Sequence, residues 1–229
     1  MTLPVYLDIT SLQEKLIQAG RGGYCFEHNS LLRSVLLALG FQVTNLAARV
    51  LWNLPEKTVT PRSHMLLRVE IDAKSYIADV GFGGVTLTVP LLLTPDIEQR
   101  TSHEPFRLLT TDHGYIMQAY LGQVWKSLYQ FDLQEQQLPD YEVSSWYVST
   151  YPKSLFVTSL IAARPDTDCR YALLNNQLTT HYLDGRTERR LLTTVNSLLT
   201  TLETEFRLQL PPIADLETAL QPVVASINP

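Results

Sequence analysis

Two segments near the N-terminus carry apolar residues at helical spacing. Between Leu31 and Leu39 apolar side chains recur every three or four positions, which predicts a helix that begins at Cys25 and stops at Gly40. The segment Ser11–Ala19 shows the same pattern over a shorter length. We therefore expect a short amphipathic helix followed at once by a longer one.

After Gly40 the apolar runs become short and rich in β-branched and aromatic residues, which is typical of strands. In chain order we expect strands at Gln42–Trp52, His64–Ile71, Ser75–Val80, Thr86–Leu93, Phe106–Thr110, Tyr115–Leu121, Val124–Phe131 and Tyr141–Val143. After an irregular stretch at Ser144–Ser154, we expect strands at Leu155–Ala163, Tyr171–Leu174, Gln177–Leu183 and Thr187–Leu192, then helices at Val195–Phe206 and near Ile213–Leu220. This order predicts an α+β fold with helices first, a β-barrel or sandwich in the middle, and a mixed α/β section last.

The second and third predicted strands form a hairpin around Asp72-Ala73-Lys74. A turn of three residues would pair Leu67 with Asp79 in an antiparallel ladder. This pairing brings Asp79 close to the end of the hairpin at which His64 lies.

The composition is that of an ordinary globular protein, with 45% apolar and 18% charged residues among 229. A formal net charge of −5 argues against a nucleic-acid partner, because proteins that bind phosphate backbones usually carry clustered Lys and Arg. No apolar run is long enough for a membrane span, and the N-terminus lacks the charged and apolar regions of a signal peptide. We expect a cytoplasmic protein without a membrane partner.

The two cysteines, Cys25 and Cys169, lie far apart in unlike contexts, so free thiols fit better than a disulfide. Cys25 follows Gly22-Gly23, which allows a turn with positive φ, and it begins the predicted long helix. The unpaired N–H groups and positive dipole at a helix N-terminus favour a thiolate. Cys25 is therefore a candidate nucleophile, and the alternative is a small buried hydrophobic residue, the usual role of a free cysteine.

A cysteine nucleophile needs a base, and the base needs a third group that orients it. His64 at the start of a predicted strand and Asp79 at the end of its partner are the candidates for these roles. Taken alone, His64 could be a polar residue at a strand start, and Asp79 could be a turn former before glycine. The remaining histidines, which lie in a helix or in turn-rich stretches, compete less well as the base: His28, His103, His113 and His181.

Metal and phosphate chemistry find little support in the sequence. No Cys and His residues are paired at the short spacings of a zinc site. The glycine-rich stretch Gly81-Phe82-Gly83-Gly84 lacks the lysine and hydroxyl of a phosphate-binding loop. We expect no metal.

Three motifs together resemble the arylamine N-acetyltransferase family: Arg21-Gly22-Gly23-Tyr24-Cys25-Phe26-Glu27 with Asn29, Ser63-His64-Met65, and Ala78-Asp79-Val80-Gly81-Phe82-Gly83. The likeness continues from Ser145 to Thr150, through Arg164-Pro165, and weakly beyond Arg170, so it covers nearly the whole chain. The resemblance implies a helical region at 1–42, a β-barrel domain at 43–148 and an α/β lid domain at 149–229.

The resemblance also implies a cysteine-protease-like triad of Cys25, His64 and Asp79. In the family, such a triad takes acetyl from acetyl-CoA as a thioester and passes it, in a ping-pong reaction, to a small aromatic amine, arylhydroxylamine or hydrazine. By the same resemblance, Phe82 lines the acceptor cleft and Gly83 lies close to the pantetheine arm. Two other classes stay open: a cysteine hydrolase or amide synthase that uses the same triad, and an inactive truncated binding homologue.

Members of the family usually carry several tens of residues before the point at which this sequence begins. In those proteins the preceding helices cover the apolar faces of the segments that correspond to Ser11–Ala19 and to the Cys25 helix. We therefore expect these faces to remain partly exposed here. The chain should then form a homo-oligomer through them, or else be less stable and poorly active.

Overall fold

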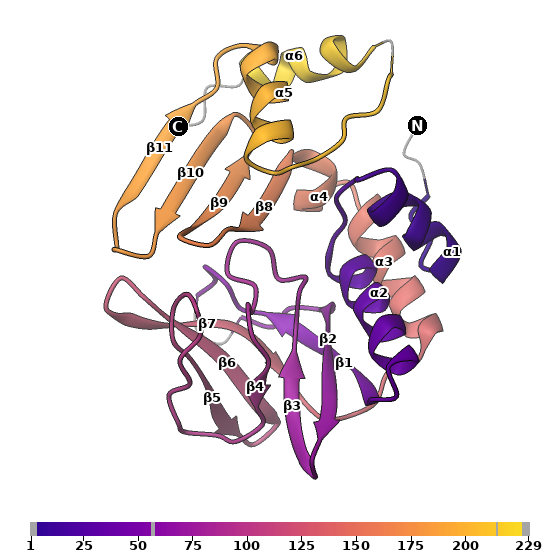
Figure 1. The fold of residues 1–229 in the computed structure, drawn as a ribbon, viewed down its shortest axis with the longest axis vertical. Helices are drawn as coiled ribbons and strands as arrows, with labels where there is room; N and C mark the ends of the chain where they lie inside the picture. The colour runs from indigo at the N-terminus through magenta and orange to yellow at the C-terminus, as the bar shows by residue number, and fades with distance from the viewer. Residues whose placement is uncertain (1–3, 56–57, 214, 226–229) are drawn as a thin grey trace.

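The computed structural model describes residues 4–55, 58–213 and 215–225. A seven-stranded sheet forms the lower part of the molecule in Figure 1, and a four-stranded sheet with two helices lies above it. The N-terminal helices lie along one side of the larger sheet. This arrangement confirms the predicted α+β class.

The N-terminal helices lie near their predicted positions, with one difference. In place of one helix at Ser11–Ala19, a short helix α1 (Ile9–Leu12) continues as a π-helix, η1 (Gln13–Gln18). Helix α2 (Cys25–Ala38) begins at the expected cysteine. It ends before Gly40, whose φ of +89° is a conformation that other residues rarely adopt.

The larger sheet consists of β1 (Gln42–Val50), β2 (Arg62–Ile71), β3 (Lys74–Ala78), β4 (Leu91–Leu92), β5 (Phe106–Thr111), β6 (Gly114–Leu121) and β7 (Val124–Phe131). Its order is β4-β3-β2-β1-β7-β6-β5, with antiparallel neighbours. Gln99 links the two outer strands, because its backbone pairs with Phe106 in β5 and its side-chain amide bonds both backbone polar groups of Leu92 in β4. This link nearly closes the sheet into a barrel.

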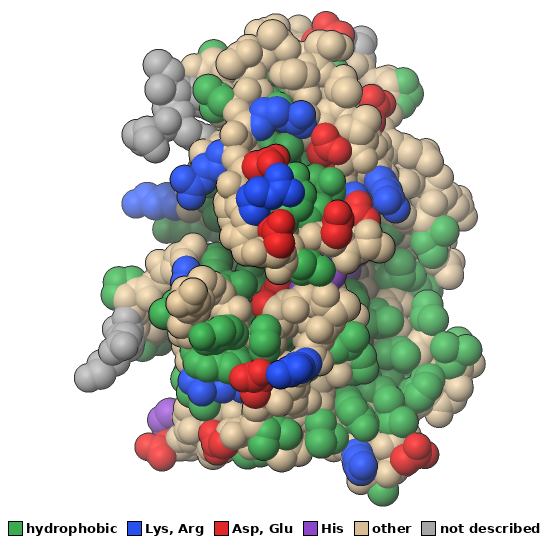
Figure 2. Space-filling model, turned by 60° about the vertical axis from the view of Figure 1, so that its left-hand side comes forward, with side chains coloured by type: hydrophobic (Ala, Val, Ile, Leu, Met, Phe, Trp, Pro, Cys, Tyr) green, Lys and Arg blue, Asp and Glu red, His purple; other side chains and the backbone are tan. Residues whose placement is uncertain are grey.

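The smaller sheet consists of β8 (Ile161–Pro165), β9 (Cys169–Leu174), β10 (Gln177–Tyr182) and β11 (Thr187–Leu191), in the order β11-β10-β9-β8. Helices α5 (Val195–Thr204) and α6 (Leu216–Ala225) pack on it around a separate apolar cluster. Over this upper part of the molecule, acidic and basic side chains alternate on the face shown in Figure 2. In this part of the chain, Arg190 and Glu205 form an ion pair at 3.1 Å.

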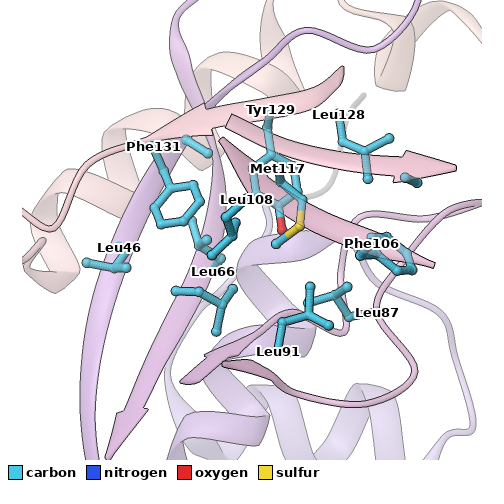
Figure 3. Close-up of a cluster of buried hydrophobic side chains, with 13 residues drawn as sticks. Leu46, Leu66, Leu87, Leu91, Phe106, Leu108, Met117, Leu128, Tyr129 and Phe131 are labelled. Carbon is cyan, nitrogen blue, oxygen red and sulfur yellow. The ribbon is translucent and has the colours of Figure 1, made fainter. Parts of the chain in front are cut away.

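Apolar side chains fill both faces of the larger sheet around β2. Inside the curved sheet, a core includes Leu66, Met117 and Tyr129 (Figure 3). On the outer face, Met65 packs in a second core with residues of α2 and of helix α3 (Leu138–Thr150). Because successive residues of a strand point to opposite faces, β2 separates the two cores.

The β2–β3 hairpin does not have the predicted register. Its turn contains only Asp72-Ala73, at φ 49° and 59°, as in the two-residue turns that suit a hairpin. Leu67 consequently pairs with Ala78, where the prediction paired it with Asp79.

This difference of one residue decides on which face Asp79 lies. Opposite partners in an antiparallel pair share a face, and a slip of one residue exchanges the faces. The predicted register would have set Asp79 on the face of Leu67, away from His64. The observed register, continued by one residue, sets Asp79 opposite Leu66, on the face that carries His64.

Helix α3 replaces a predicted strand at Tyr141–Val143 and most of the stretch Ser144–Ser154 that was expected to be irregular. Its buried residues recur at helical spacing, but one of them is polar: Tyr141, Ser145 and Val148. Its exposed side includes large apolar residues such as Trp146. The amphipathic pattern is therefore weak, which is why the sequence did not reveal it.

Two other predicted strands are much shorter than expected. Of Thr86–Leu93 only Leu91–Leu92 pairs, as β4, directly after Pro90, which has no N–H to donate to a ladder. Leu155–Ala163 divides into helix α4 (Leu155–Thr158), capped by the hydroxyl of Ser154, and strand β8.

Three further expectations concern the whole chain. Both cysteines are free, as predicted. Within residues 4–55, 58–213 and 215–225, no helix is both long and apolar enough to cross a bilayer. The division of the chain at residues 42 and 148 stays a prediction.

Candidate active site

Cys25 is the first residue of α2 and is almost fully buried. The start of the helix is held by Glu27, whose carboxylate accepts a hydrogen bond from the Tyr24 N–H at 3.1 Å and pairs with Lys15 of η1. The Cys25 Sγ lies 3.8 Å from the carbonyl oxygen of Ser63, the residue before His64. The thiol is therefore fixed at the junction of α2 and β2.

His64 lies near the start of β2, where its Nε2 and the Asp79 Oδ2 are 2.7 Å apart. Burial alone would lower the pKa of His64, but the charges of Asp79 and Cys25, with hydrogen bonds to both, raise the pKa to about 10. The ring is thus held in its protonated form between a carboxylate and the thiol.

Asp79 follows the last residue of β3, and its buried carboxylate has partners on both oxygens. Oδ2 meets His64, while Oδ1 accepts hydrogen bonds from Asn29 Nδ2 at 3.1 Å and from the Gly81 N–H at 2.9 Å. Burial would raise the pKa of Asp79, but the charge of His64 and these hydrogen bonds lower it. The aspartate is thus held as an anion at a fixed position.

The structure brings all three predicted chemical residues together from three segments. Cys25 comes from a helix, His64 from a strand, and Asp79 from the loop after the next strand. A thiol, an imidazole and a carboxylate in this order can exchange a proton between sulfur and nitrogen while the carboxylate fixes the ring. This arrangement suits nucleophilic chemistry at sulfur.

Asn29 connects these three segments through hydrogen bonds. The sequence motif includes Asn29 but did not suggest this connecting role. It lies one helical turn after Cys25 and is fully buried. Its Nδ2 donates to the Met65 carbonyl at 2.8 Å and to Asp79, and its Oδ1 accepts from the Val80 N–H at 3.1 Å. A buried amide on an otherwise apolar helix face is the signal that could have revealed it.

Gly81 allows the loop after β3 to approach α2 closely. A Cβ at Gly81 would lie 2.4 Å from the Cys25 Cα and 2.9 Å from Asn29 Nδ2, which no side chain can tolerate. The backbone of the loop therefore packs directly against the residue that carries the thiol.

The two residues expected to contact substrate lie on the same loop. Phe82 presents its ring to His64 in an edge arrangement, with centroids 5.2 Å apart, and to Tyr129 at 5.0 Å. Gly83, at φ +81°, faces the smaller sheet, because a Cβ there would lie 3.9 Å from the Ala163 Cβ. The loop thus separates the His64 ring from the smaller sheet.

Tyr129 is a further member of the site that the sequence did not suggest. Its fully buried ring lies 5.0 Å from that of His64. Burial, and then the neighbouring Asp79 carboxylate, raise the pKa of Tyr129 well above its ordinary value, so its hydroxyl stays protonated. Nothing in a strand pattern distinguishes such a tyrosine from an ordinary core residue.

Two of the other histidines have side-chain contacts away from Asp79. His103 Nε2 lies 2.9 Å from the Asp166 carbonyl oxygen, and His181 Nδ1 lies 3.1 Å from Thr187 Oγ1. Burial lowers the pKa of His28. Among the described residues, no group of three or more His, Cys, Asp or Glu side chains could hold a metal ion.

Comparison with known proteins identifies the class of protein to which this chain belongs. A family model described as N-acetyltransferase matches residues 1–215, which places the chain among acyltransferases. The arylamine N-acetyltransferase of Mycobacterium tuberculosis is 40% identical over 221 residues, which cover 94% of this chain and 78% of that protein. This chain therefore belongs to the arylamine N-acetyltransferase family.

Two further relatives carry information about ligands. The Salmonella typhimurium protein named arylamine N-acetyltransferase / N-hydroxyarylamine O-acetyltransferase is 40% identical over 181 residues, 79% of this chain and 64% of that protein. The structure of Mycobacterium marinum arylamine N-acetyltransferase in complex with CoA superposes with a TM-score of 0.90 at 37% identity, covering 97% of this chain and 83% of that one.

Proposed function

We propose that this chain transfers acetyl from acetyl-CoA to small aromatic amines through a thioester on Cys25, in a ping-pong reaction. The observation that carries the proposal is the position of His64, which bonds the carboxylate of Asp79 and directly follows Ser63, whose carbonyl oxygen lies 3.8 Å from the Cys25 thiol. Family membership supplies the acetyl group and the class of acceptor. The CoA complex of the Mycobacterium marinum protein supports the donor.

In the first half-reaction, the Cys25 thiolate attacks the acetyl carbonyl carbon of acetyl-CoA. The bond from that carbon to the CoA sulfur breaks, and the leaving thiolate takes a proton from the His64 imidazolium. The raised pKa of His64 means that the ring carries this proton at neutral pH. CoA leaves as a thiol, and Cys25 carries the acetyl group as a thioester.

In the second half-reaction, the nitrogen of the amine attacks the thioester carbonyl. Neutral His64 accepts the proton that the amine loses, and the bond to the Cys25 sulfur breaks. Asp79 keeps the ring oriented throughout and stabilises its positive charge, as the third member of a triad does. The step leaves sulfur as the thiolate and the ring as the imidazolium, ready for the next acetyl donor.

Phe82 and Gly83 are proposed to contact the substrates. A flat aryl ring offers area for stacking, and Phe82 presents an aromatic surface beside His64. Gly83 lies where this loop meets the smaller sheet, beside Ala163, and its match to the family motif supports a place close to the pantetheine arm of the donor. Arylhydroxylamines, suggested by the name of the Salmonella relative, and hydrazines are further acceptors in this proposal.

Initial rates at varied acetyl-CoA and arylamine concentrations test the proposal. Ping-pong transfer predicts parallel double-reciprocal lines and a stoichiometric release of CoA in the absence of amine. Intersecting lines with no release of CoA until amine is added would contradict the thioester. Continuous release of CoA without amine would instead indicate a hydrolase.

Self-association remains a proposal that rests on exposed apolar residues of the N-terminal helices: Ile17, Val35, Leu37 and Leu39. Exposed apolar surface favours association where it is contiguous. Light scattering over a range of protein concentrations should show a dimer or larger species. A monomer with full arylamine acetylation at every concentration would contradict it.

A further inference from the structure

The side chain of Thr86 bonds both ends of the loop segment from Asp79 to Phe82. The Thr86 hydroxyl donates to the Asp79 carbonyl oxygen at 2.9 Å and lies 3.3 Å from the Phe82 N–H, from which it accepts. The Thr86 N–H donates in turn to the Gly83 carbonyl at 3.1 Å. Thr86 is itself buried, so water cannot easily replace these bonds.

The smaller sheet holds Thr86 from the other side. Arg170 of β9 donates from Nη2 to the Thr86 carbonyl oxygen at 2.9 Å, and its Nε donates to Glu104 Oε2 at 3.0 Å. Both charged side chains are at least nine-tenths buried, with exposed fractions of 5% and 10%. A guanidinium fixed by a carboxylate has little freedom, so the position of Thr86 is set by the smaller sheet.

Asp79 and Phe82 depend on Thr86 to different extents. The Asp79 carboxylate is also held by His64, Asn29 and Gly81, none of which involves Thr86. The backbone N–H of Phe82, in contrast, bonds to the Thr86 hydroxyl. Loss of that hydroxyl should therefore displace the Phe82 ring more than the Asp79 carboxylate.

We propose that Thr86 is a positioning residue for the acceptor step, whose hydroxyl, anchored to the smaller sheet by Arg170, holds Phe82 against the incoming arylamine. This inference rests on the proposed function. It gives the smaller sheet a part in acceptor recognition. That part is exerted through Thr86 and Arg170, which lie outside the triad of Cys25, His64 and Asp79.

The test compares Thr86→Val, which keeps the size of the side chain and removes the hydroxyl, with Thr86→Ser, which keeps the hydroxyl and removes the methyl. Each half-reaction is measured separately, as release of CoA without amine and as transfer from the preacetylated protein to arylamine. Thr86→Val should lower kcat/KM for arylamine about 10-fold, the order expected for one buried hydrogen bond, mainly through KM. Release of CoA should change less than about threefold, and Thr86→Ser should stay within about threefold of wild type in both steps.

A role in packing alone would give the opposite ranking, because Thr86→Ser then loses packing and Thr86→Val does not. Equal damage to both half-reactions by Thr86→Val, or transfer as fast as wild type, would overturn the inference alone. A wild-type protein that transfers no acetyl to any arylamine would overturn the proposed function first.

Arg170→Lys tests the anchor, since it keeps a positive charge beside Glu104 but cannot reproduce the fork of the guanidinium. If Arg170 acts through Thr86, the effects of Arg170→Lys and Thr86→Val on the acceptor step should be less than additive in the double variant. Full additivity would contradict the anchor. Thermal unfolding of each variant shows whether a loss of activity comes from a damaged fold. If Arg170→Lys is damaged in this way, the comparison of Thr86→Val with Thr86→Ser decides whether the inference holds.

Discussion

Cys25 and Cys169 are both buried, at 6% and 1% exposure, and each is the first residue of a regular element. Their neighbours differ. Cys25 begins a helix and contacts His64, whereas burial and the nearby Asp168 and Asp166 raise the pKa of the Cys169 thiol and disfavour its thiolate. Burial alone therefore says little about a cysteine, and the charges around it decide its chemistry.

The largest effect should come from removing each thiol in turn. Cys25→Ala should lower acetyl transfer by at least about 10⁴-fold, because no other group can form the thioester. Cys169→Ala should retain activity within about threefold, since this thiol takes no part in the reaction. Steady-state transfer to an arylamine measures both. Substantial activity in Cys25→Ala would show that the wrong cysteine has been assigned.

The next largest effect should come from an acidic residue in the surroundings of each cysteine: Asp79, which acts on Cys25 through His64, and Asp168, which lies next to Cys169. Asp79→Asn places an amide where three donors converge, so the imidazole loses its orienting acceptor. We expect a loss of about 10³- to 10⁴-fold in rate, by analogy with triads generally. Asp168→Asn, beside the other cysteine and exposed, is the matched control and should leave the rate unchanged. Circular dichroism should show a retained fold in both.

A smaller effect is expected from the loop that packs on Cys25. Gly81→Ala would force a Cβ to within 2.4 Å of the Cys25 Cα, so loop and helix must separate. A displacement on the order of 1 Å can cost about 10² in rate, and we expect a loss of that order. Gly84→Ala adds the same methyl at an ordinary contact of 3.9 Å and should change the rate little. Equal rates for the two variants would contradict the close packing.

The smallest effect concerns pH and compares two histidines. Because the pKa of His64 is raised to about 10, its charged form stabilises the fold fully below its ordinary value of 6.5 and less as pH rises toward 10. The difference in unfolding free energy between wild type and His64→Gln, measured in urea, should therefore shrink from pH 6 to pH 10.

His181 supplies the control of opposite sign. Burial lowers its pKa, so the fold loses stability as pH falls through the ordinary value of 6.5 and gains nothing further above it. His181→Gln should show no change between pH 8 and pH 10. A His64 difference that stays constant or grows toward pH 10 would contradict the ion pair.

The sequence revealed residues that lie at the ends of elements, and it missed those that connect elements. Cys25 follows a glycine pair at a helix start, and His64 and Asp79 end the two strands of one hairpin, so local signals marked them. Asp79 was predicted as a site residue although the predicted register of the hairpin was wrong. The register was wrong because the residue types of Asp72 and Ala73 do not reveal a two-residue turn in which both have positive φ.

Asn29 and Thr86 show why the rest of the site was missed. Each acts through hydrogen bonds to residues that lie elsewhere in the chain and meet it only in the folded state. Helix α3 was missed for a related reason, since its buried Ser145 bonds the Tyr24 hydroxyl at 2.8 Å and so breaks the apolar pattern. Propensity and periodicity report local preference, and these residues serve long-range contacts.

The acetylated protein shows directly which cysteine carries the acetyl group. Wild-type protein is incubated with acetyl-CoA in the absence of amine, digested, and analysed by mass spectrometry of the peptides that contain Cys25 and Cys169. We expect one acetyl group on the Cys25 peptide, none on the Cys169 peptide, and loss of the group when an arylamine is added. Acetylation of Cys169 alone, or transfer to arylamine without acetylation of Cys25, would contradict it.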